Sequence, residues 1–140
     1  MGHFYAYLAR MRLIKRWGLM RNTREENVQE HGLQVAVVGH ALGIIENHFF
    51  EGRVNPERIM ALAAFHEVGE VFTGDLPTPI KYFNPSIKAA YDEIEDFAKE
   101  KLLTMLPEAL RPEYKKLFFH QVEDERAWKL VKGADKITAY

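Results

Sequence analysis

Apolar residues recur every three or four positions along most of the chain, and this period is typical of helices that bury one face. The N-terminal stripe begins at Phe4 and runs up to Trp17. A second stripe, over residues 28–45, is so dense in Ala, Val and Leu that we expect that helix to be buried on most sides. Three later stripes are Ile59, Leu62, Ala63 and His66; Ile87, Tyr91, Ile94, Phe97, Ala98 and Leu102; and Trp128, Val131, Ala134 and Ile137.

Cap and breaker residues place the boundaries of these helices. Asn55 before Pro56 indicates a helix start, because Asn caps a helix N-terminus and Pro suits the first helical turn. Glycine and proline punctuate residues 73–85, which predicts an ordered loop there. Asp124 is a candidate N-cap for the last helix.

The fold class that follows from these patterns is all-α. Strand signals are scarce, since there is no sustained two-residue alternation and no Asn-Gly or Asp-Gly hairpin turn. We predict a single domain over residues 1–140, built as a bundle of about six helices. The last apolar register still runs at Ile137 without a Gly or Pro stop, so we expect further helices to follow residue 140.

Composition narrows the function classes. The chain has 140 residues and no cysteine, which excludes a disulfide scaffold, a thiol nucleophile and a cysteine zinc site. Nineteen basic and twenty acidic residues balance, so bulk charge attracts neither nucleic acid nor an anionic membrane. No apolar run approaches membrane-span length, and basic residues interrupt the N-terminal segment where a signal peptide would need an apolar core. We expect a soluble, cytoplasmic protein.

Histidines and carboxylates at helical spacing suggest a metal site. Glu70 lies four residues after His66, which places both on one helix face, and Glu67 adjoins His66. Asp135 lies within an apolar helix. A mixed imidazole–carboxylate set suits manganese, cobalt, iron or zinc. The alternative is structural: a hydrogen-bonded core histidine, two solvated glutamates, and an Asp135 that pairs with Lys132 or Lys136.

Longer motifs point to a family. His31, His66-Glu67 and Asp135 resemble the pattern His … His-Asp … Asp of HD-domain metal-dependent phosphohydrolases. The resemblance is closest to the HD-domain 5′-deoxynucleotidases, which hydrolyse deoxyribonucleoside 5′-monophosphates. The segments that carry it are Arg16-Trp17, Leu19–Asn22, Glu26–Val28, Glu30-His31, Leu33–Ala36, Glu70-Val71, Thr73–Pro79 and Lys81–Phe83.

The resemblance implies a role for each matching residue. His31, His66, Glu67 and Asp135 would ligate a divalent transition metal, cobalt or manganese first, with zinc, iron or copper as alternatives. Glu70 would be the catalytic carboxylate that orients or deprotonates the attacking water. The substrate-binding residues would be Arg16, Trp17, His31, Asp75, Leu76, Pro77, Thr78 and Asp135.

The substrate implied is a deoxynucleoside monophosphate. Asp75 would accept a hydrogen bond from the 3′-hydroxyl, and a tight wall over residues 75–78 would reject a ribose 2′-hydroxyl. The resemblance also implies a homodimer, and it offers no reason to expect nucleic-acid or membrane binding.

Position 67 departs from the family pattern, which has Asp where this chain has Glu67. The additional methylene moves the carboxylate by about one bond length, and a misplacement of that order affects rate. Two alternatives therefore stay open. One is a degenerate HD module with a weakened metal site that serves as a nucleotide-binding or interaction domain. The other is an HD phosphohydrolase that acts on a triphosphate or a cyclic nucleotide.

Overall fold

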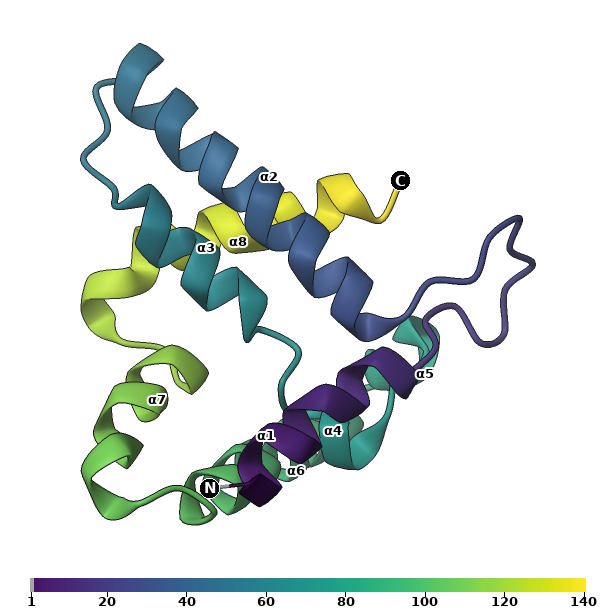
Figure 1. Cartoon of the computed structure of the whole chain (residues 1–140). Helices are drawn as coiled ribbons and strands as arrows, with labels where there is room; N and C mark the ends of the chain where they lie inside the picture. Colours follow the sequence, from purple (N-terminus) through teal and green to yellow (C-terminus); the bar gives the residue numbers. More distant parts are fainter. Residues whose placement is uncertain (1) are drawn as a thin grey trace. The chain divides into compact units, whose positions relative to one another are not determined.

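The computed structural model describes residues 2–140, and these residues are helical almost throughout (Figure 1). The all-α prediction is therefore confirmed, with eight α-helices and three short 3₁₀ helices in place of about six helices. The elements are α1 (Gly2–Ala9), η1 (Arg10–Leu13), α2 (Val28–Phe49), α3 (Pro56–Ala64), α4 (Glu70–Thr73), α5 (Thr78–Lys81), α6 (Pro85–Thr104), η2 (Glu108–Leu110), α7 (Arg111–Phe118), η3 (Val122–Asp124) and α8 (Glu125–Thr138).

Backbone contacts divide the chain into two compact units. The first unit comprises Met1–Glu30 and Glu67–Pro112, and the second comprises His31–His66 and Glu113–Tyr140. Each unit therefore combines segments from distant parts of the sequence, and each is described by itself below. The single-domain expectation stays a prediction.

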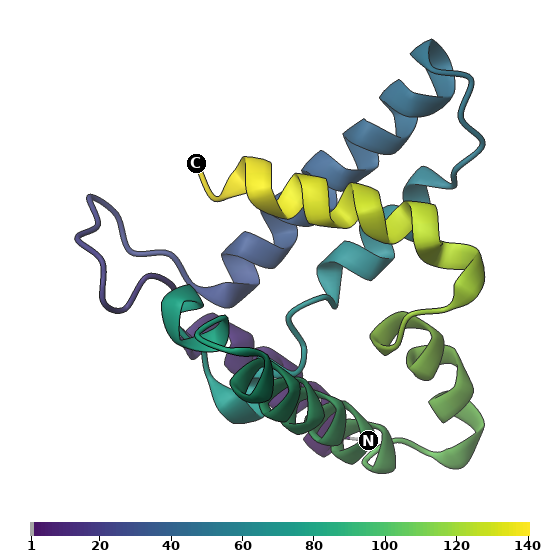
Figure 2. The ribbon, with the colours of Figure 1, turned by 180° about the vertical axis from the view of Figure 1, so that it is seen from behind.

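The second unit has a core shared by α2, α3 and α8. In Figures 1 and 2, α8 crosses the helices α2 and α3, and α3 and α8 are in direct contact. A Cβ on Gly43 would lie 2.9 Å from Ile59 Cδ1, so the absence of a side chain there allows α2 and α3 to approach closely. The buried residues of this core are Val35, Ala36, Ile59, Leu62, Ala63, Ala127, Val131 and Ala134.

The first unit packs α1, α4 and α5 against the long helix α6. Phe4 of α1 is fully buried, and Tyr7 stacks on Phe72 of α4 with ring centroids 4.9 Å apart. A Cβ on Gly69 would lie 3.3 Å from the Cβ of Glu95, which shows how closely α4 begins against α6. Figure 2 shows α6 running beside α1. The expected helix over 87–102 is confirmed, with Tyr91, Ala98, Leu102 and Leu103 buried.

Several local predictions were wrong. The chain leaves the α-helix after Ala64 and forms turns over residues 65–69, so His66 and Glu70 do not share a helix face. The first stripe continues only to Leu13 as helix, and Trp17 lies in a loop with a positive φ of 59°. The expected loop over 73–85 contains the short helix α5.

The burial expected of the second helix was also wrong. One side of α2 is open to solvent, because tertiary partners cover only the face that meets α3 and α8. The large apolar side chains that it exposes are Leu33, Val37, Ile44, Ile45 and Phe49. None of the helices within residues 2–140 is both long and apolar enough to cross a membrane.

One of the two predicted helix caps is confirmed and the other is wrong. Asn55 caps α3 as expected, since its side chain accepts a hydrogen bond from the Arg58 backbone amide. Asp124 precedes α8 but makes no capping hydrogen bond. Its carboxylate instead accepts two hydrogen bonds from the Arg58 guanidinium, at 3.1 and 2.7 Å. A buried carboxylate is stabilised more by a bidentate cation than by one backbone amide.

Replacing this carboxylate should destabilise the second unit. Asp124→Ala removes the carboxylate partner of the partly buried Arg58, and we expect the free energy of unfolding to fall by about 2 kcal/mol. Urea denaturation measures the change. Glu113→Ala, which removes an exposed carboxylate near Lys116, is the matched control and should change stability by less than about 0.5 kcal/mol. Equal effects of the two variants would contradict a structural role for the Arg58–Asp124 pair.

Candidate metal centre and substrate loop

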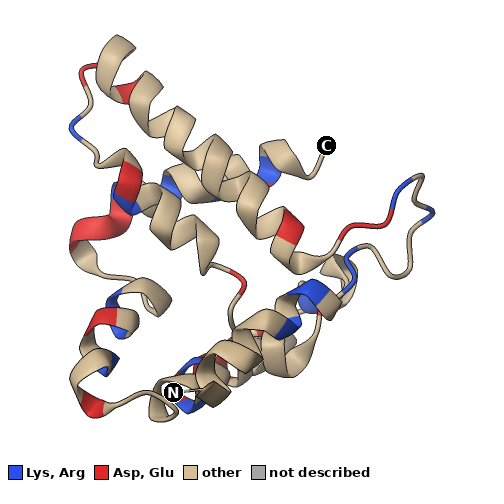
Figure 3. Cartoon of the chain, in the orientation of Figure 1, with Lys and Arg blue, Asp and Glu red and all other residues tan. Residues whose placement is uncertain are grey.

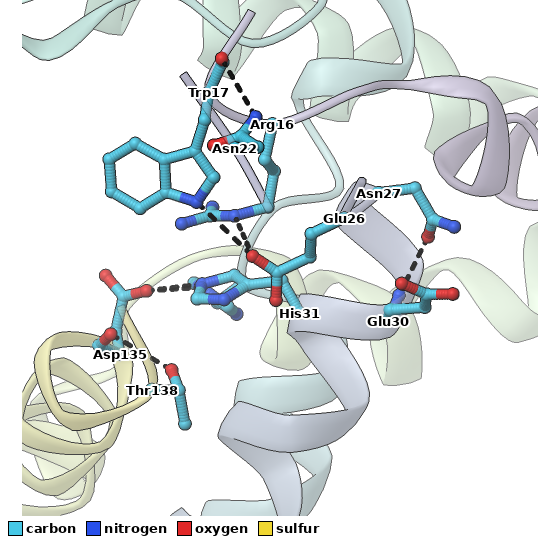
Figure 4. A network of polar contacts seen from close by, with 10 residues as sticks. Arg16, Trp17, Asn22, Glu26, Asn27, Glu30, His31, Asp135 and Thr138 are labelled. Atoms are coloured by element: carbon cyan, nitrogen blue, oxygen red, sulfur yellow. Dashed lines mark hydrogen bonds and ion pairs between the residues drawn. The ribbon is translucent and has the colours of Figure 1, made fainter. Parts of the chain in front are cut away.

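Three of the predicted metal ligands converge within the second unit. His31 on α2 is fully buried, and its Nε2 lies 2.6 Å from Oδ1 of Asp135 on α8 (Figure 4). Nε2 of His66 lies 3.7 Å from the same oxygen, and the two imidazole centroids are 5.7 Å apart. Asp135 therefore pairs with the histidines, and the alternative pairing with Lys132 or Lys136 was wrong.

Local structure aims each of these side chains. His31 lies in the second turn of α2, which begins at Val28. His66 follows the end of α3, and its Nδ1 donates to the Ala63 carbonyl, so Nε2 is the nitrogen directed toward Asp135. A histidine whose other nitrogen is held by a carbonyl has a fixed tautomer and ring orientation, as metal-ligating histidines usually do.

The carboxylate of Asp135 is held in its charged form. Burial works to raise its pKa, but the interactions with the neighbouring His31 and His66 rings outweigh burial and place the pKa well below the ordinary value. The backbone carbonyl of Asp135 also accepts a hydrogen bond from the Thr138 hydroxyl, near the C-terminal end of α8 (Figure 4). An ionised carboxylate beside two imidazoles is a ready donor set.

This cluster opens to solvent through a pocket in the second unit. His66 and Asp135 lie at one side of an open pocket of about 600 Å³. Its other walls include the stacked rings of His120 and Trp128, with centroids 4.1 Å apart. A metal site that borders an open pocket has room for an exchangeable ligand, unlike a closed structural site.

The donor set fits a divalent transition metal. The ligand atoms of His31, His66 and Asp135 lie within 4.8 Å of one another. Two imidazoles and a carboxylate suit manganese, cobalt, zinc or iron better than soft-thiolate metals. Glu67 follows His66 directly in the sequence and offers a further carboxylate.

The first unit holds the predicted phosphate-binding residues in a loop over residues 14–27, which carries charges of both signs (Figure 3). Glu26 organises this loop. Its Oε2 accepts hydrogen bonds from Arg16 Nε at 3.3 Å and Trp17 Nε1 at 3.4 Å (Figure 4). Its carbonyl also accepts the Arg16 amide at 2.9 Å. The Arg16 guanidinium lies over the Trp17 ring, 5.2 Å from the centroid.

Carboxylates gather in the same unit around α4. Glu70 is buried rather than on a solvated face, and burial, a hydrogen bond with Glu67 and the charges of Asp75 and Glu95 raise its pKa far above the ordinary value. Burial likewise raises the pKa of Asp75, against the lowering effect of Arg16 and of a hydrogen bond from the Trp17 amide. The structure thus brings Arg16, Trp17 and Asp75 together within the first unit.

The remaining predicted substrate-binding residues lie at the start of α5 and just before it. Leu76 and Pro77 are partly buried, and Thr78 is exposed at the first position of α5. Sequence reasoning missed the supporting residues, which are Glu26 for the loop over residues 14–27 and Lys81, Tyr91 and Glu95 for the segment before α5. The signal for the last two was present: Tyr91 and Glu95 are four residues apart, so a glutamate shares the helix face of a buried tyrosine.

In its fold the chain is similar to solved HD-domain phosphohydrolases. A crystal structure of such a protein from Listeria innocua matches with a TM-score of 0.85 and 23% identity, over 97% of this chain and 64% of that one. The HD phosphohydrolase DatZ of cyanophage S-2L, bound to dA and one catalytic Zn²⁺ ion, matches with a TM-score of 0.67 and 26% identity, over 96% of this chain and 66% of that one. The fold is therefore that of the HD-domain phosphohydrolases.

The sequence places the chain in one family within this class. A family model described as 5′-deoxynucleotidase YfbR-like matches residues 3–140. A 5′-deoxynucleotidase of Cronobacter sakazakii is 55% identical over 140 residues, covering 99% of this chain and 69% of that protein. One of Vibrio cholerae is 54% identical over 138 residues, covering 99% and 71%. The chain belongs to the YfbR-like 5′-deoxynucleotidase family, which confirms the resemblance, and it spans about 70% of these relatives' length.

The role of Glu26 in ordering the loop is testable by fluorescence. The chain has two tryptophans, so in a Trp128→Phe background the emission reports on Trp17 alone. Glu26→Gln weakens both side-chain hydrogen bonds, and we expect a red shift and faster acrylamide quenching of Trp17. The matched control is Glu25→Gln, which changes the neighbouring exposed glutamate that pairs with Lys15. If both variants leave the emission unchanged, Glu26 does not order Trp17.

Proposed function

We propose that the protein is a metal-dependent phosphomonoesterase that hydrolyses deoxyribonucleoside 5′-monophosphates to a deoxynucleoside and inorganic phosphate. The observation that carries this proposal is the convergence of His31, His66 and Asp135 beside an open pocket, in a chain of the 5′-deoxynucleotidase family. The dA-bound DatZ, with its catalytic Zn²⁺, supports a nucleotide substrate and a metal for this fold.

His31, His66 and Asp135 would hold the metal, with Glu67 as a fourth ligand. Manganese and cobalt are the ions first expected, and zinc, iron and copper are alternatives. When bound, such an ion lowers the pKa of a coordinated water and offsets charge on a phosphoryl oxygen. His31 and Asp135, which reach the same centre, would also contact the substrate phosphate.

Glu70 is the proposed catalytic carboxylate. Its burial fixes the side chain, and burial together with the neighbouring carboxylates raises its pKa. A raised pKa makes the ionised carboxylate a stronger base than a free one, so it can orient a water and accept a proton from it. We assign it the orientation and proton transfer of the attacking water.

The loop residues would bind the rest of the nucleotide. Arg16, held by Glu26 and stacked on Trp17, would pair with phosphate oxygens. Asp75 would accept a hydrogen bond from the 3′-hydroxyl, and Leu76, Pro77 and Thr78 would complete the wall at the sugar. A wall that closely fits deoxyribose would leave a 2′-hydroxyl clashing or unpaired.

Two further properties belong to the proposal. The absence of cysteine accords with a cytoplasmic enzyme. A homodimer is the expected assembly, with no nucleic-acid or membrane partner.

Glu67 favours one competing function. Because the HD pattern has Asp at this position, a weakened metal site would convert the chain into a nucleotide-binding or interaction module. The two functions make different predictions for phosphate release.

The proposed activity predicts phosphate release from dAMP. In the presence of Mn²⁺ or Co²⁺, we expect the purified protein to release phosphate from dAMP much faster than from AMP, and to leave dATP and cyclic AMP intact. Glu70→Ala should lower the rate at least about a hundredfold, because positioned acid–base groups contribute that much. No release from dAMP with any metal would favour the module, and release from dATP or cyclic AMP would favour another HD phosphohydrolase. Equal rates with dAMP and AMP would contradict the deoxyribose specificity.

The proposed ligands predict a loss of metal affinity on substitution. Asp135→Asn keeps the side-chain shape but removes the charge, and we expect Mn²⁺ affinity to fall at least about tenfold by calorimetry. The control is His40→Ala, which should bind Mn²⁺ as the parent does. His40 is on the same helix as His31, but it is half-buried and its Nε2 lies 3.9 Å from Oε1 of Glu57. Glu67→Asp should bind as well or better. Unchanged affinity in Asp135→Asn would place the metal elsewhere.

A further inference from the structure

The hydroxyl of Tyr91 contacts the backbone of Gly74, immediately before Asp75, the proposed sugar-binding residue. Tyr91 lies on α6 and is buried, and its hydroxyl is 3.2 Å from Thr73 Oγ1 and 3.4 Å from the Gly74 carbonyl oxygen. Thr73 Oγ1 donates to the same carbonyl at 2.9 Å. Two hydroxyl groups thus converge on one carbonyl oxygen, which has two lone pairs and accepts from both.

The geometry of Gly74 makes this contact consequential. Gly74 has a φ of 72°, in the left-handed region that glycine adopts without strain, and its amide donates to the Glu70 carbonyl at 2.8 Å. Because the peptide group is planar, the direction of the Gly74 carbonyl also sets the direction of the Asp75 amide. Holding this carbonyl therefore fixes where Asp75 leaves the turn.

The Tyr91 side chain is itself held from two sides. The Lys81 ammonium lies 4.9 Å from the centroid of the ring, and it also lies 3.5 Å from Oε1 of Glu95, one turn further along α6. Glu95 packs where Gly69 leaves room for it at the start of α4. The ring thus has little freedom to move away from the Gly74 carbonyl.

We propose that Tyr91 is a positioning residue that fixes Asp75 through the Gly74 carbonyl, and that it thereby sets the discrimination between deoxyribose and ribose. The sugar-contacting role of Asp75 rests on the proposed function. The hold of Tyr91 on the loop rests on the contacts above. Tyr91 does not touch the reacting atoms in this scheme; it acts on the substrate only through residues 74–78.

Tyr91→Phe isolates the hydroxyl, since the ring and its packing stay. We expect KM for dAMP to rise and the ratio of kcat/KM for dAMP over AMP to fall, each about fivefold, the factor that one lost hydrogen bond of ordinary net strength gives. We expect kcat for dAMP and Mn²⁺ affinity to stay within about twofold of the parent. Tyr82→Phe removes a hydroxyl from a neighbouring exposed tyrosine and should leave all four quantities unchanged.

A double-mutant cycle separates positioning from simple stability. Thr73→Val removes the other hydroxyl, and its effect on the dAMP/AMP ratio should be strongly non-additive with that of Tyr91→Phe, because both act on one carbonyl. A merely structural tyrosine would lower the melting temperature without changing the ratio. An unchanged ratio in Tyr91→Phe, or additive effects in the cycle, would overturn the proposal.

Hydrogen exchange provides a readout that does not need catalysis. In Tyr91→Phe we expect faster exchange of the amides at residues 74, 75, 76 and 78, with unchanged exchange in α8, and no such change in Tyr82→Phe. If the parent protein releases no phosphate from dAMP, the proposed function fails, yet the exchange rates still decide whether Tyr91 holds the loop. Unchanged exchange in that loop would overturn the positioning role whatever the activity.

Discussion

The contact between His31 and Asp135 constrains how α2 and α8 pack in the second unit. It joins residues 104 positions apart, and it takes a fully buried imidazole to a carboxylate on another helix. A buried polar ring is tolerated only when it has such a partner, so α2 and α8 must keep their mutual register. Gly39 of α2 lets this helix approach both α3 and α8, since a Cβ there would lie 3.1 Å from Ile59 Cγ2 and 3.8 Å from Ala134 Cβ. In this unit, the helix packing that forms the core also positions the side chains of the donor set.

Much of this arrangement could be predicted from the sequence, because its signals are local. The apolar period predicted the long helices α2, α6 and α8, and the Asn55-Pro56 pair predicted the start of α3 with its cap. The histidines and Asp135 carried no local signal for their convergence. Their common site followed from the resemblance to HD-domain proteins, and the structure brings His31, His66 and Asp135 together.

The errors arose where tertiary contacts override local preference. Four-residue spacing suggested one helix face for His66 and Glu70, but the helix ends after Ala64 and the chain turns before α4. Asp124 had the right residue type for a cap, yet a bidentate arginine from α3 offers it a stronger interaction. Glu70 looked solvated because nothing in the sequence shows that α6 covers α4. Such competition between partners is decided by the folded structure and cannot be read from spacing.

The first unit carries a feature that stability alone does not explain. Glu67, Glu70 and Asp75 act on one another electrostatically, and burial raises the pKa of both Glu70 and Asp75. One oxygen of Glu70 is buried with no hydrogen-bond partner among residues 2–140. Grouping carboxyl groups in this way opposes folding, because each loses hydration and is repelled by the others. An apolar residue at position 70 would pack there at lower cost, so this acidic group accords with the catalytic role proposed for Glu70. Arg16 opposes this effect at Asp75, because its charge lowers the pKa of that carboxyl against the larger raising effect of burial.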